Sequence, residues 1–538
     1  MIIYPCGNCR NLSHQFCEIV YEHLVIERMD PKYTSWFLHG EQLSASSHQE
    51  DVKISDTYKM FRDVHVKDDD FAESISKSRE RELTRSLEDV ETPLYLGCTK
   101  YTKFSTIVAL YKHKAAHDHS DESFDELLRI VSDMLPEDNT LVKSVYSKKK
   151  MLKTFDLGYE KIHACVNDCC LFRKDLELKE TCPKCNCSRW KVDKRTKKIK
   201  KGVLVKVLRY FPIIPTFKRM FKSQERAKQL TWHSSHKSQD GKMRHPVDSL
   251  AWESIDQKWH SFASNPRNLR LGLSADGFNP FANLSSKYSC WPVMLVTYNL
   301  LSWLCMAKEN IMLTLLIPGP KQPGNNIDVY LEWLVENLIE LWTNGVRAYD
   351  AANNSMFNLK AILMWTINDF PTYRNLAGCT IKGKVACPIC TTNTCSQWLS
   401  NSKKTLYMGH RRFLAPDHPF RMKRSWFDGK QELRGKPKPL NGSDVFGVVK
   451  DIENNWGKAT NERKSKKSQI IKEKEPVCVQ PWKKKSIFFN LPYWNALLLR
   501  HNLDVMHIEK NVCESIISIL LNLKGKSKDG LKARKDLE

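Results

Sequence analysis

Two aspartates stand directly after runs of residues that indicate β-strands, and paired carboxylates are a common basis of metal chemistry. In RNLRLGLSADGFNPF, apolar residues alternate with small or charged ones up to Asp276, and a Gly-Phe-Asn-Pro turn follows. Strict alternation of this kind is typical of a strand. Asp369 comes at the end of a second apolar run, FNLKAILMWTINDF. Asp276 alone would suit a turn-initiating residue, so a catalytic role requires another carboxylate beside it.

The elements between the two aspartates indicate how they could meet. WPVMLVTYN and IMLTLLIPGP each predict a strand, and NIDVYLEWLVENLIELWTNGV predicts a helix that ends at Gly345. The resulting order of strand, strand, strand, helix, strand is the opening half of an RNase H-like domain. The fourth strand then lies parallel to the first, with the helix as crossover. We therefore expect an α/β fold in which Asp276 and Asp369 converge.

Such a pair predicts metal-dependent chemistry on phosphodiesters. Two neighbouring carboxylates repel each other unless a cation lies between them. A pair of Mg²⁺ (or Mn²⁺) ions would serve, since one ion activates the attacking water or hydroxyl and the other stabilises the leaving oxygen. We expect Asp276 and Asp369 to be the catalytic ligands.

Two cysteine pairs predict a structural zinc site. In HACVNDCCLFRKDLELKETCPKCNCSRWK, Cys165 and Cys169 are followed by Cys182 and Cys185. Close pairs joined by a short loop are the arrangement of a zinc ribbon, and four protein ligands leave no open coordination position. A looser set near the start, Cys6 and Cys9 with His23 and His39, could form a second tetrahedral site. A chance pair of cysteines with two surface histidines would look the same.

The charge balance favours a polyanionic partner. The 538 residues include 85 Lys and Arg against 61 Asp and Glu, a net charge of +24. Nucleic acid is the first candidate for such a chain, although a basic surface alone would give the same total. The expected DNA contacts lie after the zinc ribbon, in the basic and aromatic segment that follows, and in YMGHRRFL: Lys197, Lys198, Lys200, Lys201, Arg209, Lys218, Arg219, Arg411 and Arg412. Half-buried lysine and arginine stems would give a similar pattern in the middle segment.

The chain carries features of an intracellular, nuclear protein. Its 18 cysteines follow an N-terminus without a secretory signal, which favours zinc over disulfides. The most apolar run, WPVMLVTYNLLSWLCM, contains polar residues and is shorter than the ~20 residues of a membrane span. The clusters KRTKKIKKG and ERKSKKSQIIKEK could direct nuclear import, or could be solvated loops.

Composition and periodicity divide the chain into successive modules. DESFDELLRIVSDMLPE predicts a helix capped by Ser120 or Asp121. The expected modules are a zinc-binding segment (1–44), a charged linker (45–95), a small helical module (96–160), a zinc ribbon with a basic tail (161–202), a basic and aromatic connection (203–265), the first part of the RNase H-like core (266–370), and an incomplete insertion region (371–538).

Taken in order, many stretches resemble plant transposases of the CACTA (En/Spm) type. The resemblance rests on PCGNCRN, WFLHGE, GYEKIHACVNDC, CPKCNCSRWK, KVLRYFPIIP, WHSSHKSQDGKMRHPVDSLAW, RNLRLGLSADGFNPF, LLIPGPKQPGNNIDVYL, MWTINDFPTYRNLAG, KGKVACPIC, YMGHRRFL and LRHNLDVMHIEKNVCESI. It implies a DDE/D transposase that binds the terminal inverted repeats of its element, cuts there and joins the ends to target DNA, acting as a multimer. It also implies that Cys387 and Cys390 are the cysteine half of a zinc site in an insertion that splits the catalytic domain.

The third catalytic acid is the open point of the resemblance. We expect that acid, and the histidines matching Cys387 and Cys390, beyond residue 538, so that the chain is a partial or inactive copy. Within the chain, RHNLDVMHIEKNVCESI places His501, Asp504 and His507 on one helix face. This polar cluster could contact zinc or DNA, or could consist of capping and hydrogen-bonded residues of an ordinary helix. Glu509 and Glu514 are less favoured third acids.

Three hypotheses follow. The chain is a metal-dependent transposase, a non-catalytic zinc-dependent DNA-binding protein derived from one, or a zinc-ribbon transcription regulator unrelated to transposons. Paired strand-end acids separate the first two from the third, because a binding module does not need them.

Overall fold

The computed structural model describes most of the chain after residue 91. The described residues are 92–117, 119–141, 159–193, 195–196, 198–236, 238, 240–280, 288–458 and 480–521, together with 2–3, 14–15, 532 and 535–536. The short strands β1 (Ile2–Ile3) and β2 (His14–Gln15) pair with each other. The predicted site residues Cys6, Cys9, His23, His39 and Lys197 lie outside the described residues, as does most of the predicted linker 45–95.

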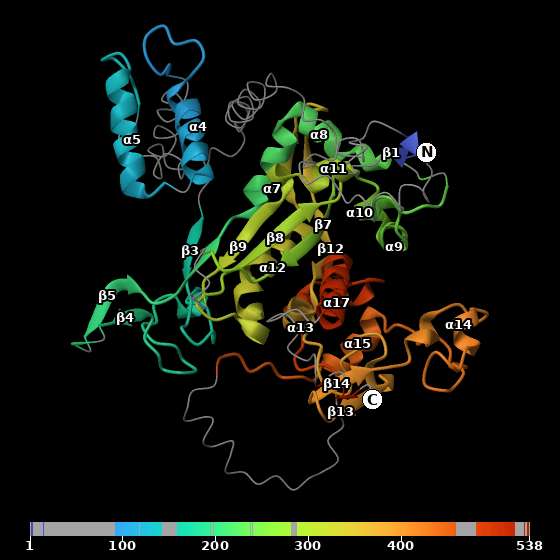
Figure 1. Ribbon diagram of the computed structural model, residues 1–538. Helices are drawn as coiled ribbons and strands as arrows, with labels where there is room; N and C mark the ends of the chain where they lie inside the picture. Colours follow the sequence, from blue (N-terminus) through green and yellow to red (C-terminus); the bar gives the residue numbers. More distant parts are fainter. Residues whose placement is uncertain are drawn as a thin grey trace.

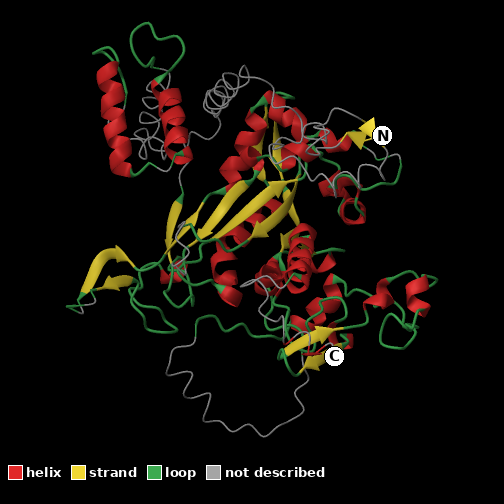
Figure 2. Ribbon diagram, in the orientation of Figure 1, coloured by secondary structure: helices red, strands yellow, loops and turns green. Residues whose placement is uncertain are grey.

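A seven-stranded mixed sheet forms the centre of the described part, with helices on both sides (Figures 1 and 2). The spatial order of its strands is β15 (His501–Leu503), β12 (Ala361–Asn368), β7 (Leu269–Ala275), β8 (Trp291–Thr297), β9 (Met312–Ile317), β6 (Val207–Tyr210) and β3 (Glu160–His163). The predicted α/β class is therefore confirmed.

The predicted element order is present, with one addition. β7, β8 and β9 form an antiparallel meander, α12 (Ile327–Thr343) follows, and β12 pairs in parallel with β7. Gly345 comes just after α12 with a positive φ of 73°. The predicted buried strand before Asp369 is β12, but the start of the predicted run, Phe357–Leu359, belongs to β11 (Ser355–Leu359), which forms a hairpin with β10 (Val346–Asp350).

The central strand β7 is buried on both faces, which its alternating sequence did not predict. Arg270 is 2% exposed and ion-pairs with Asp256. Its guanidinium lies 4.3 Å from the ring centroid of Trp252 on α9 (Leu250–Lys258), and Phe262 on α10 (His260–Ala263) also contacts it. A buried cation needs such partners, so the polar residues of β7 mark a second covered face rather than a solvent face.

The modules before the core include two helical pairs and a small hairpin. The predicted helices of the 96–160 module are α4 (Lys103–Ala116) and α5 (Asp121–Met134), and Ser120 rather than Asp121 caps α5. The hairpin of β4 (Trp190–Val192) and β5 (Ile199–Leu204) projects from the ribbon region, and α7 (Ile213–Lys222) and α8 (Gln224–Leu230) follow β6 (Figure 1). β3 and β6 are strands of the main sheet, so the ribbon segment is continuous with the core.

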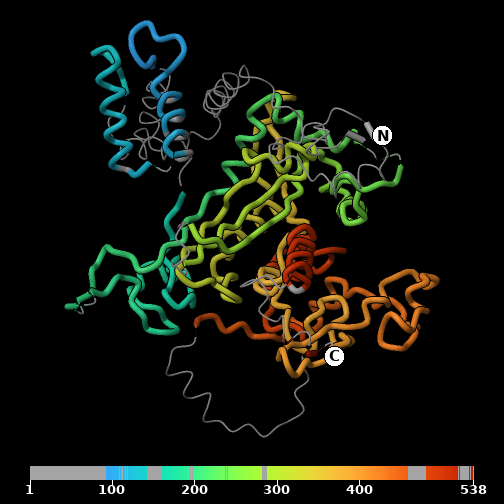
Figure 3. The backbone as a smooth tube through the Cα atoms, in the orientation of Figure 1, coloured from blue at the N-terminus to red at the C-terminus, as the bar shows by residue number. Residues whose placement is uncertain are grey.

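A long excursion separates β12 from its other neighbour, β15. It contains α13 (Phe370–Ala377), the hairpin β13 (Ser396–Leu399) and β14 (Lys404–Tyr407), α14 (Pro419–Met422) and α15 (Gly442–Val449). The chain then returns through 480–500 to β15, which pairs in parallel with β12 and leads into α17 (Val505–Leu520). The tube in Figure 3 shows this orange and red part gathered beside one end of the sheet. Among the described helices, none combines the length and apolarity needed to cross a bilayer.

Candidate active site and cysteine metal centre

Asp276 and Asp369 follow two adjacent parallel strands at equivalent positions. The register pairs Ser274 of β7 with Ile367 of β12, so each aspartate lies two residues beyond that pair. Adjacent strands are about 4.8 Å apart. The same ends of parallel strands meet at one edge of a sheet, and the two carboxylates therefore lie at one edge on neighbouring strands, as the sequence predicted.

A third aspartate, Asp504, stands at the same edge. The register pairs Asn368 of β12 with Leu503 of β15, so Asp369 and Asp504 each follow that pair by one residue. The N–H of Asp504 donates to the carbonyl of Asn368 at 2.8 Å. Asp369 thus lies between Asp276 and Asp504 along the edge. The expectation that an acid of this kind would lie only beyond residue 538 did not anticipate this one.

Each of the three carboxylates has one oxygen held by a backbone N–H. Oδ1 of Asp276 accepts from Gly277 at 2.6 Å, Oδ1 of Asp369 accepts from Thr372 at 2.8 Å, and Oδ1 of Asp504 accepts from His507 at 3.1 Å. Among the described residues, no hydrogen bond or ion pair to the three Oδ2 atoms is seen. The side chains are therefore positioned, yet each keeps an oxygen available for a ligand.

Two of these aspartates also cap helices. Asp369 is the N-cap of α13, and the carbonyl of Asp504 accepts from Ile508 in the first turn of α17. Helix N-termini carry partial positive charge, which favours negative groups beside them. Carboxylate oxygens are the ligands that hard divalent cations such as Mg²⁺ or Mn²⁺ prefer. In the described structure the three aspartates do not bring one oxygen each within 4.8 Å of one another.

His501, beside this edge, is half-buried and packs against core residues. Its Nδ1 lies 2.7 Å from Oγ1 of Thr366, and its ring contacts Tyr373 and Trp494 at centroid distances of 5.4 and 5.6 Å. Burial, with Arg500 nearby, lowers the pKa of His501 to about 3. The imidazole is therefore neutral and structural, whereas His507 at the start of α17 is exposed.

The four predicted ribbon cysteines form one cluster. The sulfur atoms of Cys165, Cys169, Cys182 and Cys185 all lie within 4.8 Å of one another, and the Cys165–Cys185 pair is 3.4 Å apart. A tetrahedral zinc with Zn–S bonds of about 2.3 Å needs sulfurs about 3.8 Å apart. Burial raises the pKa of the Cys165 thiol to about 12, so a cation is needed to stabilise the thiolates. The cluster could hold a metal ion such as zinc.

Buried charges join this cluster to the core. Asp168, which is 0% exposed, accepts hydrogen bonds from Lys206 and Tyr330 and forms an ion pair with Lys458 at 2.5 Å. Tyr330 belongs to α12, and Lys458 follows α15. A Cβ on Gly457 would lie 2.6 Å from the sulfur of Cys169, so only glycine fits there. The ribbon, α12 and the end of the insertion thus meet at the cysteine cluster.

The second predicted cysteine pair forms a tight turn. The N–H of Cys390 donates to the sulfur of Cys387 at 3.3 Å, and burial, with Cys387 next, raises the pKa of Cys390 to about 11. Cys395 lies near, and its sulfur accepts from Arg434 at 2.7 Å. In the described part of the chain, only the Cys165 cluster brings three or more ligand atoms within 4.8 Å, so zinc at Cys387 and Cys390 stays a prediction.

The predicted DNA contacts differ in exposure. On β5, Lys200 and Lys201 are 57% and 72% exposed and pair with Asp193 and Glu180, and Lys198 before them is also exposed. Arg209 on β6 and Lys218 and Arg219 on α7 are half-buried.

Arg411 and Arg412 hydrogen-bond to carbonyl groups of the protein's own backbone. Arg411 donates to the carbonyls of Phe420, Arg421, Lys423 and Lys430 and pairs with Asp428. Arg412 is 8% exposed and donates to the Asn393 carbonyl. Contact of the predicted basic residues with DNA stays a prediction, and these two guanidinium groups are already engaged.

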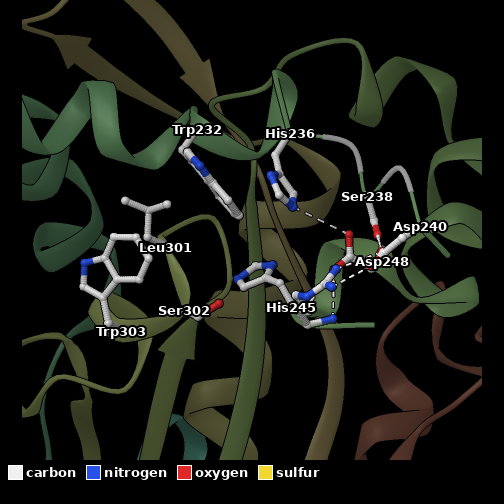
Figure 4. Close-up of a pocket in the computed structure, with 10 residues that line it drawn as sticks. Trp232, His236, Ser238, Asp240, His245, Asp248, Leu301, Ser302 and Trp303 are labelled. Carbon is white, nitrogen blue, oxygen red and sulfur yellow. Dashed lines mark hydrogen bonds and ion pairs between the residues drawn. The ribbon is translucent and has the colours of Figure 1, made fainter. Parts of the chain in front are cut away.

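A cavity of about 480 Å³ lies at the opposite edge of the sheet (Figure 4). Trp232 stacks on His236 at 4.5 Å, and His236 lies 3.8 Å from Asp248. Leu301 to Trp303 complete the wall after β8. Because β8 runs antiparallel to β7, its end lies away from the three aspartates, so this cavity belongs to a different part of the surface.

Sequence reasoning identified two of the three edge aspartates and the four ribbon cysteines. It noted Asp504 only as part of a polar cluster on a helix face, because the short segment HNL gave no alternation that predicts a strand. The sequence feature that could have drawn attention to Asp504 was its position directly before a helical pattern, in the same polar cluster as His507. Asp168 carried no sequence signal beyond its place between two cysteines.

Comparison with known families supports a transposase. Residues 240–452 match the model of transposase family tnp2, and residues 1–41 match that of the transposase-associated domain. No curated protein matches the chain. The first match includes Asp276 and Asp369, and Asp504 lies beyond its end.

Proposed function

We propose that this transposase is of the CACTA (En/Spm) type and that Asp276, Asp369 and Asp504 form the catalytic triad of an RNase H-like domain. One observation carries the proposal: three aspartates directly follow three adjacent parallel strands. The strand order β9, β8, β7, β12, β15, in which β7, β12 and β15 are parallel, supports the RNase H-like assignment. The long excursion between β12 and β15 is then the insertion that the resemblance implied.

In this proposal the protein positions charge rather than supplying a nucleophile. The backbone N–H groups of Gly277, Thr372 and His507 orient the three carboxylates, and each free Oδ2 is the expected metal ligand. A bound pair of Mg²⁺ or Mn²⁺ ions would activate the attacking water or 3′-hydroxyl and stabilise the leaving oxygen of the phosphodiester. The helix N-termini at Asp369 and Asp504 place partial positive charge beside these two carboxylates.

The partners and location follow from the same proposal. The net charge of +24 favours DNA, here the terminal repeats of the element and the target site. Zinc at the Cys165 cluster would be structural, because four thiolates complete its coordination. We place the protein in the nucleus, where its substrate is, acting as a multimer that holds two element ends together.

A cleavage assay with matched variants tests the proposal. The full chain is incubated with Mn²⁺ and a labelled DNA duplex that carries the terminal repeat of its element. We expect Asp276→Asn, Asp369→Asn and Asp504→Asn each to lower the cleavage rate by at least about 100-fold, because each removes a negative metal ligand. Asp133→Asn, at an exposed site on α5, should cleave like the original chain.

Two outcomes would contradict the proposal. If Asp504→Asn cleaves normally while the other two variants are inactive, the third acid lies elsewhere. If the original chain binds the repeat but never cleaves with Mg²⁺ or Mn²⁺, the alternative of a non-catalytic DNA-binding protein derived from a transposase holds. Near-ultraviolet circular dichroism of each variant shows whether the fold is kept.

A further inference from the structure

An exposed group of aromatic rings lies on a loop of the insertion around α14. Within this aromatic lobe (residues 410–434), Phe420, Trp426 and Phe427 are 41%, 65% and 46% exposed. Their centroids lie close together, with Phe420 5.8 Å from Trp426 and 6.3 Å from Phe427. Large rings that gather at a surface mark a binding site more often than rings scattered singly. In Figure 1 the lobe projects from the body at α14.

Buried arginines hold the lobe in this form. Arg421, 5% exposed, donates to the carbonyls of Arg411, Arg412, Leu414 and Arg434. Arg411 bonds a second set of carbonyls around the loop, and its guanidinium stacks 4.2 Å from the Phe427 centroid. The backbone is therefore fixed by polar contacts, and the rings are free to face solvent. A surface that is already ordered loses less entropy on binding.

The charge around the rings is positive. Nζ of Lys423 lies 3.6 Å from the centroid of Trp426, a close cation–π contact. The exposed cations of the lobe that make no ion pair with a described residue are Lys423, Arg424 and Lys430, and Lys436 and Lys438 follow just after it. The acids of this segment are fewer: Asp428 pairs with Arg411, Glu432 pairs with Arg434, and Asp417 is exposed. The lobe thus offers aromatic faces within a cationic surround, which complements a polyanion that also presents flat rings.

The lobe belongs to the part of the chain that continues from the aspartate edge. Asp369 caps α13, and the chain runs from α13 through the β13–β14 hairpin into the lobe before returning to Asp504. In the common view of Figures 1 and 2, α13, the β13–β14 hairpin and the lobe lie below the sheet, whereas α8 lies above it. Double-stranded DNA hides its base faces, whereas unpaired bases expose them for stacking on aromatic side chains.

We propose that the aromatic lobe binds single-stranded DNA, with Trp426 as the stacking platform for an unpaired base and Lys423 beside its phosphate. This inference rests on the proposed function, since DNA strands that have been cut and separated present such bases. Stacking on an aromatic side chain is tolerant of sequence, so the lobe selects unpaired over paired DNA rather than one base over another.

Binding of labelled oligonucleotides to the full chain tests the proposal. The probes are a single-stranded 12-mer of thymidine and a mixed-sequence duplex of the same length, at fixed salt. We expect Trp426→Ala to weaken binding of the single strand by about 5- to 150-fold, the range for loss of one base–aromatic contact, and to leave duplex affinity within about twofold. Lys423→Ala should weaken both, and the single strand more.

Trp398→Ala is the matched control, because Trp398 on β13 is 63% exposed yet lies outside the ring cluster. It should leave both affinities unchanged. Equal losses for single strand and duplex in Trp426→Ala, or no loss in either, would overturn the inference. A change in molar mass by light scattering in Trp426→Ala would instead assign the rings to contact with a second copy, which also overturns it.

The cleavage assay separates this inference from the proposed function. Asp276→Asn should lose cleavage but bind the single strand as tightly as the original chain does. Like the original chain, it should therefore bind the single strand more tightly than the Trp426→Ala variant. A chain that never cleaves but shows this preference would disprove the catalytic proposal and retain the lobe as a single-strand site. If the chain cleaves DNA but Trp426→Ala leaves single-strand binding unchanged, the catalytic proposal is kept and the lobe is not a single-strand site.

Discussion

Single residues show most clearly what sequence can and cannot predict. Asp276 was predictable because an alternating run ends on it, and Asp369 because a buried run does. Asp504 was not, since only the pairing of β15 with β12 brings it to the same edge from more than a hundred residues away. The burial of Arg270 was not predicted for another reason. Alternation marks which residues share a face, but it does not show whether a helix covers that face.

Gly272 shows the same limit and gives a stability prediction. A Cβ there would lie 2.2 Å from the hydroxyl oxygen of Tyr298, which is 5% exposed and accepts from Nε1 of Trp365. We expect Gly272→Ala to lower the free energy of unfolding by about 1–3 kcal/mol, because overpacking a rigid core forces side chains from their rotamers. Urea denaturation measures this.

Gly447 in α15 is the control, because a Cβ there would meet no atom within 4 Å. Gly447→Ala should be neutral or should stabilise by up to about 1 kcal/mol, since alanine favours a helix. An equally mild effect at Gly272 would show that the packing around Tyr298 can yield.

At the scale of elements, the cysteine spacing predicted a ligand set but not what it connects. Two close pairs on short turns were enough to assign Cys165, Cys169, Cys182 and Cys185 to one site, and the sulfurs do gather. Local spacing could not show that Asp168, between two of these cysteines, would be buried against Tyr330 of α12. Long-range contacts of this kind depend on the tertiary fold. The zinc ribbon, which the sequence predicted as a separate module, therefore packs against α12 of the core.

Metal content distinguishes ligands from neighbouring thiols. Cys182→Ser should lower bound zinc by about one equivalent per chain and reduce the melting temperature, because binding of a structural metal contributes to folding. The measurement is elemental analysis after dialysis, with calorimetry on the same samples. Cys187→Ser is the control: its sulfur accepts from the Asn167 amide at 3.3 Å but lies outside the four-sulfur cluster. Loss of zinc in both variants would mean that the ligand set is shared among more cysteines than the four.

For the whole molecule, the order of strands and the crossover helix were predictable because periodicity changes sharply at each boundary. The extent of the sheet was not, since β3 and β6 come from the predicted ribbon and connecting segments, and each is only four residues long. The net charge predicted a polyanionic partner but not where it binds. The structure divides the basic residues into those that hold loops together, such as Arg411 and Arg421, and those left at the surface.

Burial of histidines makes the stability of the whole described body depend on pH. His233 is 7% exposed and packs against Trp252 at 5.2 Å, and burial, with Arg270 nearby, lowers its pKa to about 4. Its ordinary pKa is about 6.5, so below that value the unfolded chain binds a proton that the folded chain refuses. Stability is therefore lost as the pH falls from about 6.5 toward 4.

His233→Gln tests this contribution, because glutamine cannot titrate. Between pH 7 and pH 5 the original chain should lose about 2 kcal/mol more unfolding free energy than the variant, as the difference between the two pKa values requires. The variant itself should be less stable at pH 7, since its side chain packs less well against Trp252, but its dependence on pH should be flatter. Urea denaturation at both pH values gives the comparison. Equal slopes for the two proteins would mean that His233 is reached by water in the folded chain, and that the cover α9 provides over this face of β7 opens readily.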